Sequence, residues 1–330
     1  MKKILVFGAY GSIGLYLVEY LRDHLNPQEY QIVAAGRRDT TFFSKYNIDY
    51  FQVDVQNRID FNKLPSNDVY AVIHLANMLP SKMDTYDPYL YLNVNTIGTL
   101  NVLEYMRRVK AKRILFTQTY ADLGGHWGKE LVLRNSLPRK MNYRGDHAVY
   151  AISKCAAVDL MEHYHQEFGI ENYVFRLPNI YMYSPKKYYY VDGRKTLISY
   201  RYMIEQAIKG EPIELWGNPD LGRDIVYIKD LCQMMYLALL CKRDTGTYNV
   251  GTGKMTTMRE QIEGIIEVFS PDGKKSRIIP RPEKRNSMSY VMDISEAREE
   301  LGYIPKYDYI SYLNDYKKEM LSKRWEGIVI

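Results

Sequence analysis

Cysteine is scarce in this chain of 330 residues, which contains only three. Cys155, Cys232 and Cys241 are odd in number and lack C-x-x-C spacing, so neither a disulfide framework nor a zinc site is indicated. With 46% hydrophobic and 25% charged residues, the chain can bury a core without cross-links. Low cysteine content is typical of a reducing compartment, so we expect a cytoplasmic protein without a metal centre.

Long apolar runs are also absent. No window approaches the ~18 consecutive apolar residues of a membrane-spanning helix, and the run Ile4–Phe7 is too short for the core of a signal peptide. The formal net charge is +6, but the basic residues are scattered rather than clustered. A scattered excess favours an anionic small ligand over nucleic acid. We therefore expect neither a membrane nor a nucleic-acid partner.

Apolar strands alternate with helices through the first half of the chain. Helices are predicted at 12–25, at 87–109, where Asp87-Pro88 is a typical start, and at 148–168, where Gly169 ends the helix. This alternation predicts an α/β fold with a Rossmann-type doubly wound parallel sheet, joined by right-handed crossovers. The predicted strands lie at or within 2–8, 31–36, 50–55, 68–77, 112–119 and 172–181.

Three glycines, Gly8, Gly11 and Gly14, follow the first predicted strand and open the first helix. A turn without side chains lets backbone N–H groups approach a pyrophosphate, and the positive end of the helix points at the same place. The spacing G-x-x-G-x-x-G differs by one residue from the standard dinucleotide fingerprint. The turn therefore predicts a dinucleotide cofactor held by Gly8, Tyr10, Gly11, Ser12, Ile13 and Gly14.

The end of the second strand indicates which dinucleotide is bound. Arg37 and Arg38 favour the 2′-phosphate of NADP, although Asp39 could instead hold the ribose hydroxyl of NAD. We therefore expect NADP rather than NAD. Asp54 and Val55 follow the third strand, where the adenine edge would lie, and a solvated turn is the alternative for Asp54.

Tyr150 and Lys154 lie four residues apart on a predicted helix, so their side chains leave the same face. An ammonium near a phenol favours the phenolate, so we expect Lys154 to lower the pKa of Tyr150 and make it a general base. Thr119, at the carboxyl end of the fifth strand, could hydrogen-bond the same substrate oxygen, and Thr117 is its competitor.

The rhythm of strands and helices ends near residue 180, where short elements and proline-bearing loops take over. We expect residues 1–178 to form the dinucleotide-binding domain with the catalytic Thr, Tyr and Lys. Residues 179–330 would mainly form a smaller α/β substrate-binding domain. A segment at about 225–252 is expected to return to the first domain.

Ten short segments, spread over nearly the whole chain, match one known family as a set: "GAYGSIG", "VDV", "HLAN", "NVNTIGTLNVLE", "LFTQT", "YAISK", "RLPNIY", "GRDIVYIKD", "YNVGTG" and "DISEAREELGY". With them the chain resembles the extended short-chain dehydrogenase/reductase superfamily, specifically its NAD(P)-dependent epimerase/dehydratase family of sugar-nucleotide enzymes. The resemblance implies an enzyme with Tyr150 as base, Lys154 as the residue that tunes it, and Thr119 as hydroxyl partner. Further cofactor-binding residues implied are Leu75, Ala76, Asn95, Thr117 and Leu177.

The resemblance also implies a nucleoside-diphosphate sugar as substrate. A guanidinium matches phosphate oxygens bidentately, which suits arginines for the diphosphate. The implied substrate-binding residues are Arg223 on the diphosphate, Arg281 as second phosphate ligand with Arg285 as its alternative, and Asn179 beside the sugar or its phosphate.

Departures from the family pattern bear on which of the family's reactions is expected. Dehydratases of this family carry an acid pair directly after the active-site threonine, where this chain has Tyr120 and Ala121. Asp122 comes one residue later, Leu123 replaces a usual tyrosine, and Met182 replaces a usual glycine beside the sugar. The loop residues His126 and His147 are expected to be structural or solvated rather than catalytic acids.

The function expected from the sequence is that of an epimerase or ketoreductase that transfers hydride at a sugar carbinol carbon, with C4 as the expected position. A sugar-nucleotide dehydratase is one alternative, and a non-catalytic dinucleotide-binding protein on the same fold is another. The helices at about 88–108 and 150–168 carry apolar residues beyond one face, which predicts a homodimer paired through them. These residues are Leu90, Leu92, Leu100, Val102, Ala156, Ala157, Leu160 and Met161.

Overall fold

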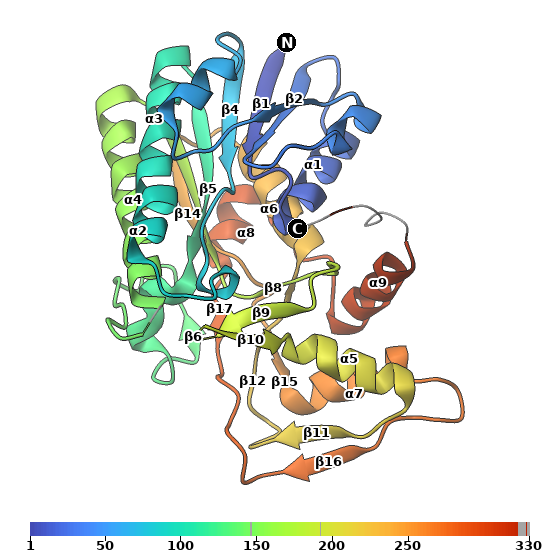
Figure 1. Ribbon diagram of the computed structural model, residues 1–330. Coiled ribbons are helices and arrows are strands. Elements are labelled where there is room, and N and C mark those ends of the chain that lie inside the picture. The colour runs from blue at the N-terminus through green and yellow to red at the C-terminus, as the bar shows by residue number, and fades with distance from the viewer. Residues whose placement is uncertain (146, 192, 323–327, 329–330) are drawn as a thin grey trace.

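The computed structural model of the protein describes residues 1–145, 147–191, 193–322 and 328. Its centre is a sheet of seven parallel strands in the order β14-β7-β5-β4-β1-β2-β3 (Figure 1). The strands are β1 (Lys2–Phe7), β2 (Tyr30–Gly36), β3 (Asp49–Gln52), β4 (Val69–His74), β5 (Arg113–Thr119), β7 (Glu171–Leu177) and β14 (Thr245–Asn249). This topology confirms the predicted Rossmann-type doubly wound fold.

Side chains of successive strand residues enter two different cores. In β1, Ile4 and Val6 belong to the core under α1 (Ser12–His24) and α6 (Ile228–Leu240), whereas Leu5 and Phe7 face α3 (Gly98–Val109) and α4 (His147–Phe168). Because both faces are covered, the strands read as continuous apolar runs. The strand order reverses between β1 and β4, and in such sheets the ligand crevice lies outside the carboxyl ends at that point.

The helix predicted from Asp87 begins where the cap signal places it. The Asp87 side chain accepts hydrogen bonds from the backbone N–H groups of Tyr89 and Leu90, and Pro88 occupies the first helical position. The helix is not uniform, because a π-helical turn at Leu92–Ile97 separates α2 (Pro88–Tyr91) from α3. Such widened turns are rare and frequent at functional sites, and no local sequence signal predicted this one.

The chain leaves the sheet after β7 and returns to it. The helix α6 packs against α1, and β14 pairs with β7 at the edge of the sheet. The other helices are α5 (Ser199–Lys209), α7 (Met258–Phe269), α8 (Ser295–Leu301) and α9 (Tyr309–Leu321). The remaining strands form two-stranded pairs: β6 (Val132–Leu133) with β17 (Val291–Met292), β8 (Ile180–Tyr181) with β13 (Val226–Tyr227), β9 (Tyr188–Val191) with β10 (Arg194–Leu197), β11 (Ile213–Trp216) with β16 (Ile278–Arg281), and β12 (Gly222–Asp224) with β15 (Met255–Thr257).

Most of these pairs, with α5 and α7, form a smaller body beyond the carboxyl edge of the sheet (Figure 1). Within the described ranges, no helix combines the length and the apolar character that a bilayer crossing requires.

Candidate active site

The glycine turn packs against its surroundings too closely for side chains. Gly8 has φ +77°, and a Cβ there would lie 2.8 Å from the backbone nitrogen of Ala76. A Cβ on Gly14 would lie 2.3 Å from the carbonyl oxygen of Gly8, so α1 lies directly on the turn as predicted. No side chain caps α1, and its first turn has no acid. Its first N–H groups are therefore available for an anion.

The residues predicted around the adenosine end surround this turn. The Tyr10 ring packs against the rings of Phe42 and Phe43. Arg37 and Arg38 are exposed directly after β2, as is Asp39. The loop they occupy is anchored on β3, because the Gln52 side chain donates to the carbonyl of Arg37 and the Tyr50 hydroxyl to that of Arg38. The backbone of this loop is thereby fixed at the carboxyl end of β2.

Asp54 and Val55 follow β3. The Asp54 carboxylate accepts from the backbone N–H of Gln56 at 3.0 Å, which closes a local turn. Val55 is buried, and its carbonyl accepts from the Asn101 side chain. The turn explains why an aspartate occurs here without a ligand, so the adenine contact of Asp54 stays a prediction.

Tyr150 and Lys154 project from α4 toward the carboxyl end of β5. The Tyr150 and Thr119 side chains lie close enough for the threonine hydroxyl to act on the phenol, and both residues are buried. Lys154 is buried as well, with Nζ 3.7 Å from the centre of the Phe116 ring. Thr117 lies two residues earlier on β5 and is also buried. The structure therefore brings Thr119, rather than Thr117, to the tyrosine hydroxyl.

The expected lowering of the tyrosine pKa is not found in the protein alone. Burial raises the pKa of Tyr150, the Thr119 hydroxyl opposes this only in part, and the charge of Lys154 does not contribute. Burial also lowers the pKa of Lys154 to about 7. The physical reason is that burial penalises a phenolate and an ammonium alike. The pair therefore needs additional charge or polar contacts before the phenolate is favoured.

Asn95 is held by contacts within the protein, and its contact with the cofactor stays a prediction. It lies in the π-helical turn, fully buried. Its amide nitrogen donates to the Met78 carbonyl at 3.1 Å and to the Ser153 hydroxyl at 3.0 Å, and its oxygen accepts from the Met78 N–H. The Ser153 hydroxyl in turn donates to the carbonyl of Tyr150 at 2.8 Å. Both amide donors are used within the protein, so Asn95 positions the Met78 loop and the start of α4.

Arg223, on β12, is enclosed by aromatic residues. Its Nη2 donates to the Ser287 hydroxyl at 2.8 Å. Tyr120, Tyr181 and Tyr290 lie close enough for their hydroxyls to affect the guanidinium electrostatically. Among the described residues, its buried Nε has no hydrogen-bond partner. Because Tyr120 directly follows Thr119, this unsatisfied donor lies near the predicted reaction centre and fits an anionic group.

The other predicted substrate ligands are placed less favourably. Arg281 ends β16, is exposed, and forms an ion pair with Glu214 at 3.0 Å. Arg285 is exposed too, two residues before Ser287, whose hydroxyl accepts from Arg223. The pairing of β11 with β16 places Arg281 beside Glu214, and its role as second phosphate ligand stays a prediction. Asn179 is exposed directly after β7, and Leu177 pairs with Thr119 in the sheet.

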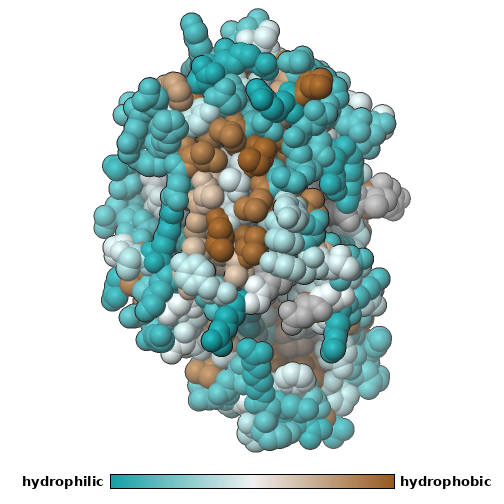
Figure 2. Space-filling model, turned by 60° about the vertical axis from the view of Figure 1, so that its left-hand side comes forward, coloured by the Kyte–Doolittle hydropathy of each residue, from teal (hydrophilic) through white to brown (hydrophobic). Residues whose placement is uncertain are grey.

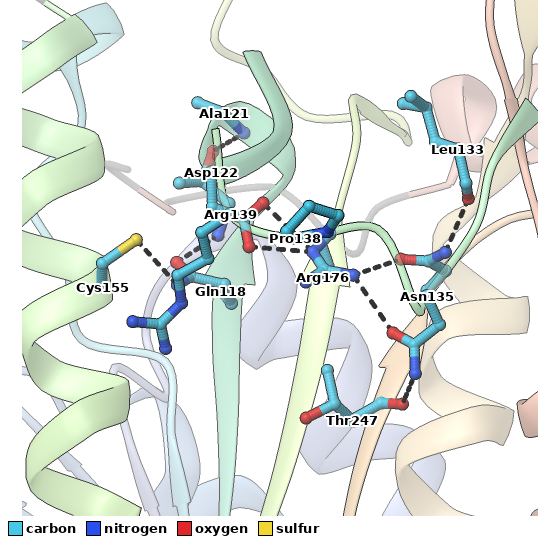
Figure 3. A network of polar contacts seen from close by, with 12 residues as sticks. Gln118, Ala121, Asp122, Leu133, Asn135, Pro138, Arg139, Cys155, Arg176 and Thr247 are labelled. Atoms are coloured by element: carbon cyan, nitrogen blue, oxygen red, sulfur yellow. Dashed lines mark hydrogen bonds and ion pairs between the residues drawn. The ribbon is translucent and has the colours of Figure 1, made fainter. Parts of the chain in front are cut away.

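Asp122 belongs to a buried network that the sequence did not reveal (Figure 3). The Nε of Arg176 donates to the two Asp122 oxygens at 3.1 and 3.0 Å. Nη1 of the same arginine donates to the side chains of Asn135 at 3.1 Å and Asn249 at 2.9 Å. This network joins β7, β14 and the loop at Asn135 to the 3₁₀ turn η5 (Tyr120–His126). Asp122 is thus the partner of a structural arginine rather than an available acid.

The two histidines considered as acids differ in their surroundings. A ring nitrogen of His126 lies 3.0 Å from the carbonyl of Pro138, which gives it a structural contact. His147 is exposed at the start of α4, with its ring centre 6.4 Å from that of Tyr150.

One cavity lies elsewhere in the described part of the chain. It has a volume of about 470 Å³ and lies between α3 and the 3₁₀ turn η2 (Arg58–Lys63), lined by residues such as Phe61, Glu104 and Arg108. The residues around Tyr150 do not line it. The candidate site is therefore defined by the convergence of side chains at the carboxyl edge of the sheet.

Comparisons with known proteins agree with the overall fold. The putative UDP-glucose 4-epimerase of Methanocaldococcus jannaschii is 27% identical over 312 residues, covering 92% of this chain and 94% of the relative. UDP-glucuronic acid decarboxylase 3 of Arabidopsis thaliana is 29% identical, covering 92% and 84%. The crystal structure of Thermus thermophilus UDP-glucose 4-epimerase in complex with NAD has the same fold, with a TM-score of 0.73, 22% identity and coverage of 99% and 100%. The family model for the NAD dependent epimerase/dehydratase family matches residues 4–251, and the chain belongs to that family.

Proposed function

We propose that the protein is an enzyme that transfers hydride at C4 of a nucleoside-diphosphate sugar, with Tyr150 as general base, and that it acts as a 4-epimerase. The observation that carries the proposal is the buried proximity of the Tyr150 and Thr119 side chains, with Lys154 one helical turn further along. Two hydroxyls that already meet can share one substrate oxygen as its proton is removed. The similar epimerases of the family support the assignment.

The bound dinucleotide would supply the hydride acceptor, and the glycine turn, the start of α1 and Lys154 are the residues that would hold it. The fit rests on the turn itself, where a Cβ at Gly8 or Gly14 would collide with backbone atoms. We propose NADP as the preferred form, because Arg37 and Arg38 end β2. The similar Thermus enzyme was crystallised with NAD, so this preference would distinguish the chain from that protein.

Two alternatives have less support. A dehydratase needs an acid directly after the active-site threonine, whereas Tyr120 and Ala121 stand there and Asp122 is paired with Arg176. A non-catalytic binding protein would not need a tyrosine, a threonine and a lysine buried together beside the crevice. The decarboxylases among the relatives share the overall fold, so the reaction has to be tested directly.

The test is an incubation of the purified protein with UDP-glucose, UDP-galactose or UDP-glucuronic acid and either NADP or NAD. We expect a true substrate to raise the melting temperature by mass action and NMR to show its C4 epimer. Release of carbon dioxide, or a 4-keto-6-deoxy product, would contradict epimerisation while leaving hydride transfer intact. If no sugar nucleotide changes the melting temperature, the proposed substrate class is wrong.

We further propose that the enzyme is a dimer paired through α3 and α4. Of the residues predicted for this interface, Val102, Ala157 and Met161 are buried in the monomer core. Other apolar side chains of the same surface remain exposed, and Figure 2 shows an apolar patch on this side of the molecule, rimmed by hydrophilic residues. The exposed ones are Leu92, Ile97 and Ile152, with exposed fractions of 39%, 45% and 38%. Such a rimmed patch is typical of an interface.

We expect Ile152→Glu to convert the dimer into monomers, because two glutamates would be brought close together without partners in a desolvated interface. Size-exclusion chromatography with light scattering measures the mass. Leu321→Glu is the control, since Leu321 is 81% exposed on α9, outside this surface. A dimer that persists in the Ile152 variant would contradict pairing through α4.

A further inference from the structure

Two lysines outside the glycine turn lie close enough to Arg38 for their charges to act on one another. Lys82 ends η3 (Pro80–Lys82), which follows β4, and Lys186 precedes β9. The two segments are far apart in the sequence, but η3 packs against β9. A Cβ on Gly193 would lie 2.7 Å from the carbonyl oxygen of Asp84, which shows how closely the β9–β10 hairpin approaches the η3 loop.

The segment before β9 is also attached to α1, the helix that opens at the glycine turn. The Tyr16 hydroxyl donates to the carbonyl of Tyr183 at 3.1 Å, and Arg201 holds the carbonyl of Ser184 at 2.8 Å. The chain is therefore fixed two residues before Lys186, close to α1. Lys82 and Lys186 approach the carboxyl edge of the sheet from different segments, with Arg37 on a third.

The charges of these residues act on one another. The Lys82 side chain is accessible to solvent, but many protein atoms surround it. Burial and the charges of Lys186, Arg38 and Arg37 lower its pKa to about 8. Burial and the charge of Arg38 also lower the pKa of Lys186. No carboxylate of the described residues contributes to either shift. Positive charges gathered in this way repel one another, and an anion between them would relieve the repulsion.

The place of this cluster indicates which anion it suits. In doubly wound dinucleotide-binding folds, the end of β2 is beside the adenosine ribose, and NADP carries an additional phosphate on its 2′-oxygen. A phosphate monoester has nearly two negative charges and three acceptor oxygens at neutral pH. Positive side chains from several segments can surround such a group and contact each of its oxygens.

We propose that Lys82 and Lys186 bind the 2′-phosphate of NADP together with Arg37, so that cofactor choice is set by three separate segments of the chain. This assignment rests on the proposed dinucleotide function of the glycine turn. It adds two residues to those that the β2 sequence motif indicates, and it gives the β9–β10 hairpin region a role in cofactor recognition.

The test measures dissociation constants of NADPH and NADH by calorimetry for the unmodified protein, Lys82→Met and Lys186→Met. The control is Lys187→Met, because Lys187 neighbours Lys186 but forms an ion pair with Glu205 at 3.0 Å. Loss of a charge-assisted phosphate contact should weaken NADPH by about 10- to 100-fold at each lysine. NADH binding should be nearly unchanged, and the control should bind both cofactors as the unmodified protein does. A second pair of probes, 2′,5′-ADP and 5′-AMP, isolates the 2′-phosphate from the nicotinamide half.

Each other outcome decides the question. Equal weakening of NADPH and NADH would place the lysines on the pyrophosphate and overturn the assignment. An unmodified protein that prefers NADH, or lysine variants that leave NADPH affinity unchanged, would overturn it as well. If neither dinucleotide binds, the proposed function fails together with the assignment. If the lysine variants behave as expected but no sugar nucleotide is converted, only the proposed function fails.

Discussion

Tyr150→Phe is expected to lower kcat by ~10²–10⁴-fold, the usual contribution of a general base. Phenylalanine keeps the ring, which packs beside Tyr91 at a centre-to-centre distance of 6.1 Å, and removes only the hydroxyl that meets Thr119. The dinucleotide affinity should therefore remain close to that of the unmodified enzyme. Steady-state kinetics with the substrate identified by epimerisation, together with cofactor calorimetry, measures the two quantities separately.

The matched control for this variant is Tyr89→Phe. Tyr89 lies at the start of α2 and is 74% exposed, so loss of its hydroxyl should not change kcat. If Tyr150→Phe retains kcat within about tenfold of the unmodified enzyme, Tyr150 is not the base. A variant that loses cofactor affinity as well would instead indicate that the hydroxyl helps to hold the dinucleotide.

Arg176→Met is expected to reduce the free energy of unfolding by ~3–5 kcal/mol, because it leaves the buried Asp122 carboxylate without its partner. Both members of this ion pair are almost inaccessible, with side-chain exposures of 7% and 2%. The same arginine also holds Asn135 and Asn249, so its loss leaves further buried oxygens unsatisfied (Figure 3). Urea denaturation measures the change in stability.

A double variant separates the structural role of Asp122 from a catalytic one. Asp122→Leu alone should also destabilise the protein, because Arg176 would then be the unpaired charge. The double variant, Arg176→Met with Asp122→Leu, leaves no buried charge unpaired. It should therefore lose less stability than the sum of the losses in the two single variants. The double variant should regain activity with its stability. A stable but inactive double variant would show that Asp122 takes part in catalysis.

Local sequence patterns predicted most of the central sheet and the start of two helices well. Six strands, the Asp87 cap and the close approach at Gly14 depend on neighbours in the sequence or on glycine itself, so their signals are short-range. The contact of Thr119 with Tyr150 followed from placing both at the same sheet edge. These predictions rest on the periodic spacing of apolar residues and on the shared direction of parallel strands.

What the sequence did not predict depends on contacts between distant segments. In the sequence Asp122 stands three residues after the active-site threonine. Only the structure shows that its carboxylate is paired with Arg176, 54 residues away. The ion pair of Arg281 with Glu214, which follows from the pairing of β16 with β11, was not predicted either. Lys82 and Lys186 stand in no motif, and only the packing of η3 on β9 brings their segments together. The raised pKa of Tyr150 depends on how deeply its side chain is buried, and the four-residue spacing to Lys154 does not reveal that burial.

The late return of β14 to the sheet has a consequence for how the protein is made. On the ribosome, β7 is complete at Leu177, but its outer edge is paired only when Thr245–Asn249 has emerged. Until then it presents unpaired N–H and C=O groups, which are a template for aggregation. Arg113 of β5 binds the carbonyls of Leu239 and Cys241 at 2.8 and 2.9 Å, and these two contacts likewise form only after that segment has been synthesised. A fragment that ends at residue 178 should therefore be insoluble when expressed alone, because the nucleotide-binding half is finished by chain synthesised after much of the substrate-facing half.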